Sequence, residues 1–211
     1  MRIITGLAKG CKLKTPRGMA TRPTSDRVKE SLFSILGNEV WGKTILDIFA
    51  GTGGLGLEAL SRGAKYAAFV DKATADIIMF NVEHTHLADK ADVFKGDVFA
   101  VMDRLADQGK RFDIVFCDPP YHLGLWERAL TQLDNGRLLN EAALVIVEQG
   151  GDENELPDLT HLKLLRNQRY GKTTQINIFE YNEVKISPSS LGGGENKLQQ
   201  VVSISPTSLK R

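Results

Sequence analysis

The sequence predicts an α/β protein built around a doubly wound, mostly parallel sheet of seven strands. Short runs rich in Val, Ile and Phe alternate with helix-like segments between residues 44 and 147. Strands of this kind are apolar throughout, because helices cover both faces of a parallel sheet. The glycine loop Gly51-x-Gly53-x-x-Gly56 directly follows the first run, where the carboxyl ends of parallel strands open a ligand-binding crevice.

A basic extension, residues 1–40, is expected to precede this core. Arg2–Leu13 carries two glycines between short apolar stretches, which predicts a hairpin. Arg22–Leu36 predicts a helix with its N-cap in Thr24–Ser25 and its end at Gly37. Its apolar stripe consists of Val28, Leu32, Phe33, Ile35 and Leu36.

The core is predicted to span residues 41–182. Its parallel strands are expected at Thr44–Phe49, Tyr66–Val70, Val93–Lys95, Phe112–Cys117 and Ala142–Val147. Helices are expected between them, near Leu55–Ser61, Thr74–Leu87, Phe99–Asp107 and Leu125–Leu133. The last two β-type stretches, Leu162–Arg169 and Thr174–Tyr181, have only Tyr170–Thr173 between them, so we expect an antiparallel hairpin at one edge of the sheet.

Composition limits the compartment and the possible partners. No apolar run is long enough to span a membrane, and the first residues lack the apolar core of a signal peptide, so we expect a cytoplasmic protein with no membrane partner. Cys11 and Cys117 are too few and too far apart for a disulfide framework or a zinc site, and no metal is expected. Residues 183–211, rich in Ser, Gly and Pro, predict a disordered tail. We expect a monomer.

The formal net charge of +1 conceals a basic N-terminus. Residues 1–29 hold eight Lys or Arg side chains against one Asp, a net charge of +7, which leaves −6 for the remainder. A basic arm on an acidic body indicates a polyanionic partner, since phosphate contacts supply most of the sequence-independent affinity for nucleic acid. A solvated surface segment explains the same charges equally well.

Three aspartates stand at or near the ends of predicted strands. Asp47 lies just before the glycine loop, Asp71 follows the second strand, and Asp97 follows the third. A dinucleotide and an adenosylmethionine cofactor both fit the loop, with Asp71 on a ribose hydroxyl. Asp47 favours adenosylmethionine, whose ammonium and sulfonium are cationic, and Asp97 is expected to accept a hydrogen bond from the adenine amine. Taken singly, Asp47 and Asp97 also fit a helix cap or a turn.

The tetrapeptide Asp118-Pro119-Pro120-Tyr121 follows the fourth predicted strand and predicts methylation of a planar amine. The Asp118 carboxylate and the Pro119 carbonyl are expected to accept the two N–H bonds of the amine, because proline removes a donor and leaves its C=O available. The ring of Tyr121 is expected to stack on the base. His122, beside it, is expected to line the same pocket.

Residues 1–181 resemble the bacterial 16S ribosomal RNA (guanine-N2) methyltransferase family. The shared pieces are Arg22–Phe33, Asp47–Gly63, Phe69–Lys72, Asp113–Tyr121 and Tyr170–Thr173. The glycine loop and the tetrapeptide occur in many amino methyltransferases, whereas the Arg22–Glu30 block is much more specific to this family. Cys11 departs from the family pattern, which has arginine there, and the tail has no counterpart.

The resemblance implies a class I, Rossmann-like methyltransferase fold, S-adenosylmethionine as cofactor, and 16S ribosomal RNA as partner, either naked or within an assembling 30S particle. The implied cofactor contacts are Asp47, Phe49, Gly51, Gly53, Gly56, Asp71, Lys72 and Asp97. The implied site for the target amine is Asp118–Tyr121. The expected RNA contacts are Lys9, Lys12, Arg22, Arg27, Lys29 and His122.

Other activities share parts of this pattern. A DNA adenine-N6 or protein glutamine methyltransferase uses the same tetrapeptide, but only about 40 residues precede the first core strand, which leaves no room for a separate target-recognition domain. A dinucleotide-dependent oxidoreductase fits the glycine loop and leaves Asp118–Tyr121 unexplained. A catalytically silent RNA-binding module stays open because of Cys11 and the tail.

Overall fold

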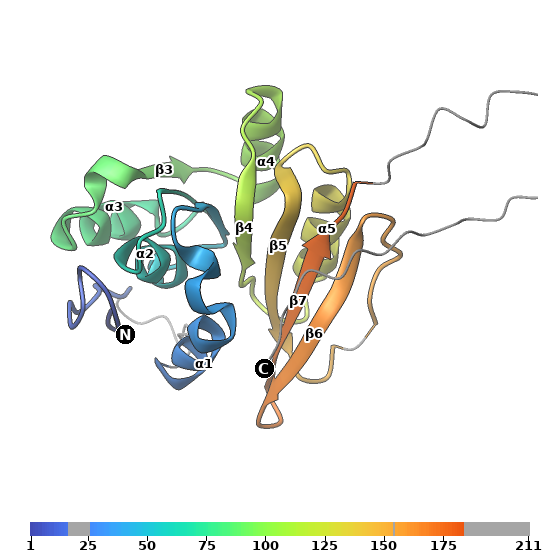
Figure 1. Ribbon diagram of the computed structural model, residues 1–211, viewed down its shortest axis with the longest axis horizontal. Helices are drawn as coiled ribbons and strands as arrows, with labels where there is room; N and C mark the ends of the chain where they lie inside the picture. The colour runs from blue at the N-terminus through green and yellow to red at the C-terminus, as the bar shows by residue number, and fades with distance from the viewer. Residues whose placement is uncertain (17–25, 154, 184–211) are drawn as a thin grey trace, which may run out of the picture.

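A computed structural model describes residues 1–16, 26–153 and 155–183. Seven strands form one sheet: β1 (Thr44–Ile48), β2 (Tyr66–Asp71), β3 (Ala91–Lys95), β4 (Phe112–Cys117), β5 (Leu139–Gly150), β6 (Leu162–Tyr170) and β7 (Thr174–Tyr181). Their order is β3-β2-β1-β4-β5-β7-β6, and Figure 1 shows β4, β5, β7 and β6 side by side. The first five strands run parallel, and β7 pairs antiparallel with both β5 and β6. The predicted sheet with its antiparallel edge is confirmed.

Helices cover both faces of this sheet. One face carries α1 (Asp26–Leu36), α2 (Gly54–Ser61) and α3 (Ala75–His84), and the other carries α4 (Val98–Asp107) and α5 (Leu125–Asp134). Two short 3₁₀ turns, η1 (Gly37–Val40) and η2 (Ala88–Lys90), complete the described elements. Ile45 and Leu46 of β1 are both fully buried, each in a different apolar cluster. The strand therefore reads as a continuous apolar run, as a strand covered on both faces must.

Two described elements, β5 and α3, differ by three residues from an end that was predicted for them. The strand expected at Ala142–Val147 extends to Gly150, because β7 pairs with Glu148, Gln149 and Gly150. The side-chain types of these three residues do not predict a strand. The helix expected to reach Leu87 ends at His84. The hydroxyl of Thr85 donates back to the Asn81 carbonyl at 2.8 Å, and His86 then takes a left-handed φ of 57°, which terminates the helix.

The first residues of the basic extension contact helices α2 and α3, through Glu58, Ser61 and Asn81. The hairpin expected at Arg2–Leu13 is reduced to one antiparallel bridge between Arg2 and Lys12. Helix α1 packs against β4, and the rings of Phe33 and Phe116 lie 5.8 Å apart between centroids. The predicted N-cap at Thr24–Ser25 lies outside the described residues.

Among the described residues, none of the helices is long and apolar enough to cross a membrane. The tail expected from residue 183 onward falls, except for Glu183 itself, outside the part of the chain that the structure describes.

Candidate active site

The carboxyl ends of the parallel strands form the edge that carries the candidate residues. Ile48 of β1 and Cys117 of β4 are paired in register, so Phe49 and Asp118 leave the sheet from the ends of adjacent strands, which are about 4.8 Å apart in the hydrogen-bonding direction. Asp71 ends β2 on the same edge. The chain reverses its strand order between β1 and β4, and open α/β sheets bind their ligands at such a point.

The glycine loop between β1 and α2 requires glycine at particular positions. Gly51 and Gly53 adopt left-handed φ values of 56° and 77°, which side chains rarely tolerate. A Cβ at Gly56 would lie 2.4 Å from Cε1 of Phe69, so only glycine lets α2 approach β2 this closely. The loop motif therefore sets both the turn and the helix packing around the proposed cofactor position.

Asp47 is a buried carboxyl beneath this loop. It is only 2% exposed, and its Oδ2 accepts a hydrogen bond of 2.8 Å from the Gly56 N–H. Burial raises the pKa of Asp47 to about 8, against the opposing hydrogen bond from Gly56 and with a further contribution from the charge of Asp71. A cationic ligand would favour the ionised carboxylate, whereas a phosphate would oppose it. The site thus suits a positively charged cofactor.

Asp71 ties the glycine loop to the start of α3. Its Oδ2 accepts from the Gly51 N–H at 3.0 Å, and its Oδ1 accepts from the N–H groups of Ala73 and Thr74 at 2.8 and 2.9 Å. Lys72, beside it, is exposed. Each carboxylate oxygen can accept two hydrogen bonds, so a ribose contact at Oδ2 is compatible with this arrangement and stays a prediction.

Two further predicted cofactor residues have structural partners. Asp97 Oδ1 accepts from the Ala100 N–H at 3.2 Å and so caps α4, which is the capping role that its sequence position also allowed. Its contact with an adenine stays a prediction. Phe49 has a left-handed φ of 57°, and its ring lies edge-on to Phe99 at 6.0 Å between centroids. A left-handed backbone is uncommon in a bulky residue and often marks a ligand site.

The predicted target pocket begins at the end of β4. Asp118 and Tyr121 are half-buried, Pro119 is buried and Pro120 is exposed. The Tyr121 hydroxyl donates to Glu148 Oε1 at 2.9 Å, and burial together with the charge of that carboxylate raises the pKa of Tyr121 above its ordinary range. The hydroxyl end of the Tyr121 ring is therefore held in place. Tyr121 itself is three residues from Asp118 in the sequence.

The hydroxyl of Tyr121 has a second neighbour, Thr174 Oγ1 of β7, at 3.4 Å. Neither Glu148 nor Thr174 was singled out from the sequence. The signal for Glu148 was available, since a carboxylate that directly continues a buried apolar strand requires a partner. Thr174 had no local signal, because only the pairing of β5 with β7 brings it to this position.

His122 directly follows Tyr121 and is exposed. Its backbone has a left-handed φ of 62°, its side chain is 61% exposed, and its ring lies perpendicular to Tyr121 at 6.2 Å between centroids. The His122 N–H donates to Glu153 Oε1 at 3.0 Å, and the same oxygen accepts from Trp126 Nε1 at 3.2 Å. Glu153, which the sequence analysis also missed, thus fixes the loop that follows Tyr121.

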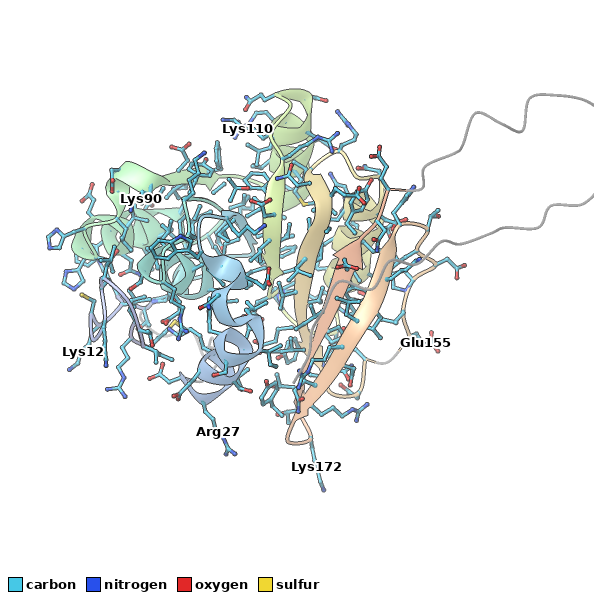
Figure 2. All side chains as sticks on the ribbon, in the orientation of Figure 1. Lys12, Arg27, Lys90, Lys110, Glu155 and Lys172 are labelled. Atoms are coloured by element: carbon cyan, nitrogen blue, oxygen red, sulfur yellow. The ribbon has the colours of Figure 1, made fainter. Side chains whose placement is uncertain are left out.

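The expected RNA contacts of the extension divide into two groups. Lys9, Lys12 and Arg27 are exposed, and Figure 2 shows Lys12 and Arg27 projecting along the edge that carries the strand ends. Arg22 lies outside the described residues. Contact of these side chains with RNA stays a prediction.

Lys29 corrects a prediction. Its side chain has no exposed surface, its Nζ donates to the Arg2 carbonyl at 2.6 Å, and it forms an ion pair of 3.3 Å with the fully buried Glu58. Burial lowers the pKa of Lys29, although the charge of Glu58 acts in the opposite direction. The predicted phosphate contact is wrong, because this ammonium neutralises a buried carboxylate and does not reach solvent.

Glu58 of α2 binds several groups of the N-terminal extension. Its Oε2 accepts from the Ile4 N–H at 2.7 Å, and its Oε1 accepts from the Thr5 N–H at 3.1 Å and from Arg62 Nε at 2.8 Å. Together with Lys29, these partners surround a carboxylate one turn beyond the glycine loop. The extension and the loop are therefore attached to the same helix.

Two open depressions lie outside this strand edge, and one of them is lined in part by Met1, Lys12 and Asp26 of the extension. An open depression lined by Gly37, Asn38, Trp41 and Arg62 lies at the amino ends of the strands, away from every candidate residue. Within residues 1–16, 26–153 and 155–183, no group of three or more His, Cys, Asp or Glu side chains is placed to hold a metal ion.

Comparison with known proteins places the chain in a family. Residues 1–179 match a family model described as Conserved hypothetical protein 95. The chain belongs to this family. It is 38% identical to the putative rRNA methyltransferase YlbH of Bacillus subtilis, over 82% of this chain and 95% of that protein. It is 40% identical to ribosomal RNA small subunit methyltransferase D of Escherichia coli K12, over 74% of this chain and 78% of that protein.

Solved structures agree with this membership. The putative methyltransferase yhhF of Escherichia coli superposes with a TM-score of 0.73 at 35% identity, covering 86% of this chain and 98% of that one. The fold is therefore that of the class I methyltransferases. The family resemblance drawn from the Arg22–Glu30 block and Asp118–Tyr121 is confirmed.

Proposed function

We propose that this protein transfers the methyl group of S-adenosylmethionine to the exocyclic N2 amine of a guanine in 16S ribosomal RNA. The observation that carries the proposal is the register of β1 with β4, which sets the glycine loop beside Asp118–Tyr121 at one strand edge. Relatives named as rRNA methyltransferases support RNA as the substrate.

The residues around the glycine loop fit S-adenosylmethionine, which supplies a methyl group activated by its positively charged sulfur. Asp47, a buried carboxyl with a pKa of about 8, would ionise opposite the cofactor's cationic groups. Gly51, Gly53 and Gly56 leave the backbone open to close approach. Asp71 orders the loop and offers its carboxylate edge to a ribose hydroxyl.

Asp118, Pro119 and Tyr121 would act on the target base. The guanine N2 lone pair is delocalised into the ring, so the amine must be turned or pyramidalised before it attacks. Hydrogen bonds from its two N–H groups to the Asp118 carboxylate and the Pro119 carbonyl favour that geometry. The Asp118 carboxylate would also take the proton that the methylated nitrogen releases.

Tyr121 would hold the base in the pocket. Removing a base from its surroundings costs a few kcal/mol, and stacking on an aromatic ring returns about 1–3 kcal/mol. The bond from the tyrosine hydroxyl to Glu148 fixes the ring that provides this stacking.

The test is transfer of tritiated methyl groups into RNA from a strain that lacks this gene. Naked 16S RNA and small-subunit particles are incubated with the wild type, with Asp118→Ala, and with Asp89→Ala, an exposed aspartate before the amino end of β3. We expect N2-methylguanosine with the wild type and Asp89→Ala, and none with Asp118→Ala. Label in adenine, or no label despite bound S-adenosylmethionine, would refute the guanine assignment.

A further inference from the structure

The hairpin of β6 and β7 reaches the same edge as the candidate active site. The last pair of its ladder joins Tyr170 to Thr174, so Gly171, Lys172 and Thr173 form the turn. In Figure 1 this turn extends beside α1, at the end of the molecule where β4 delivers Asp118. The hairpin is thus a second boundary of the site, in contact with α1 of the N-terminal extension.

The closing pair of the hairpin contacts both the extension and the target pocket. The Tyr170 hydroxyl lies 2.7 Å from Ser31 Oγ of α1, a hydrogen bond between segments at opposite ends of the sequence. Thr174 Oγ1 lies 3.4 Å from the hydroxyl of Tyr121. The position of the turn is therefore fixed relative to the ring on which the base is proposed to stack.

Lys172 stands at the turn beyond this pair and is exposed. Figure 2 shows Lys172 and Arg27 at the lower edge of the molecule, Lys12 toward its lower left, and Lys110 at the opposite, upper edge. Among residues 1–16, 26–153 and 155–183, neither Lys172 nor Arg27 has a side-chain hydrogen bond or ion pair. Two cations that are distant in the sequence therefore face solvent on elements joined by the hydrogen bond between Tyr170 and Ser31.

We propose that Lys172 binds a phosphate of the substrate RNA close to the target nucleotide, and that Arg27 on α1 is the second cation of this phosphate-binding site. Lys172 lies in the turn, two residues from Thr174, whose side chain contacts the Tyr121 hydroxyl. A phosphate held there would be next to a base stacked on Tyr121. The inference rests on the proposed function and adds the hairpin turn to the RNA-binding surface.

The test compares Lys172→Ala with Lys172→Arg and with Lys110→Ala, an exposed lysine at the far edge. For each variant we would measure 16S RNA binding by filter retention over a range of salt concentrations, and the KM and kcat of methyl transfer. Lys172→Ala should weaken RNA binding and raise the KM for RNA about three- to tenfold, and should reduce the slope of log affinity against log salt by about 1. Its kcat, melting temperature and S-adenosylmethionine affinity should stay unchanged.

The two controls separate the possible outcomes. Lys172→Arg should retain the wild-type salt slope, and Lys110→Ala should behave like the wild type. Equal RNA affinity and equal salt slope for Lys172→Ala and Lys110→Ala would overturn the proposal. Wild-type protein that binds RNA without methylating it would refute the proposed function alone, since the binding comparison would still decide the role of Lys172.

Discussion

Replacing Glu148 by alanine would release the ring of Tyr121 without touching its stacking surface. The structure provides the magnitude: a tyrosine hydroxyl donates at 2.9 Å to a carboxylate that is only 8% exposed. Hydrogen bonds to charged groups contribute about 1.5–3 kcal/mol. If about half of that orients the ring for the base, kcat/KM should fall about three- to twelvefold, since 1.4 kcal/mol corresponds to a factor of ten.

The assay is a double-mutant cycle with Tyr121→Phe, which removes the hydroxyl and keeps the ring. Glu148→Ala should reduce kcat/KM strongly in the wild type and hardly at all in Tyr121→Phe, because the hydroxyl is then already absent. Glu148→Gln retains an acceptor oxygen and should keep most of the activity. An equal loss in both backgrounds would refute the reasoning and show that Glu148 acts by another route.

Three further substitutions test the rest of the site. Asp47→Asn should weaken S-adenosylmethionine binding about tenfold or more and flatten the dependence of melting temperature on pH. The folded wild type keeps a proton up to about pH 8 that the unfolded chain releases near pH 4, so its stability should fall between those values. Lys29→Met should cost about 3–5 kcal/mol in urea denaturation, because it leaves Glu58 buried without its ammonium. Gly56→Ala should cost about 1–3 kcal/mol by the same measurement, because its methyl meets Phe69.

Each of these has a decisive control. Parallel pH profiles for wild type and Asp47→Asn would show that this carboxyl does not titrate as described. Lys29→Met should leave the salt dependence of RNA binding unchanged. A shallower slope of log affinity against log salt would instead support the phosphate contact predicted for Lys29. Gly54→Ala is the matched variant for Gly56→Ala, because its Cβ meets only the flexible end of Met1. Equal destabilisation by the two would contradict the packing argument.

The strands were predictable from sequence because helices bury both of their faces. Phe112–Cys117 and Thr174–Tyr181 have the bounds expected from their apolar runs. The polar end of β5 was not predictable, because Glu148, Gln149 and Gly150 become strand only by pairing with β7. Local composition carries no information about a partner strand that lies elsewhere in the chain.

The site was predictable where one segment carries it and not where several meet. The glycine loop and Asp118–Tyr121 are contiguous motifs, so their residues could be named in advance. Lys29 was misassigned because a lysine on a helix is normally solvated, and its sequence neighbours do not reveal that Glu58 faces it from another helix. The contact between Tyr170 and Ser31 is of the same kind, since it depends on the whole sheet being assembled.

The carboxylate of Glu58 also determines whether the extension can be treated as a separate module. Four of its partners, the N–H groups of Ile4 and Thr5 and the side chains of Lys29 and Arg62, surround it completely, and three of the four belong to residues 1–40. A fragment that begins at residue 41 would retain this charge inside the protein with one cation left to balance it. The catalytic core and its basic extension are therefore one folding unit, and removing the extension should unfold the core around α2 rather than yield a smaller enzyme with weaker RNA affinity.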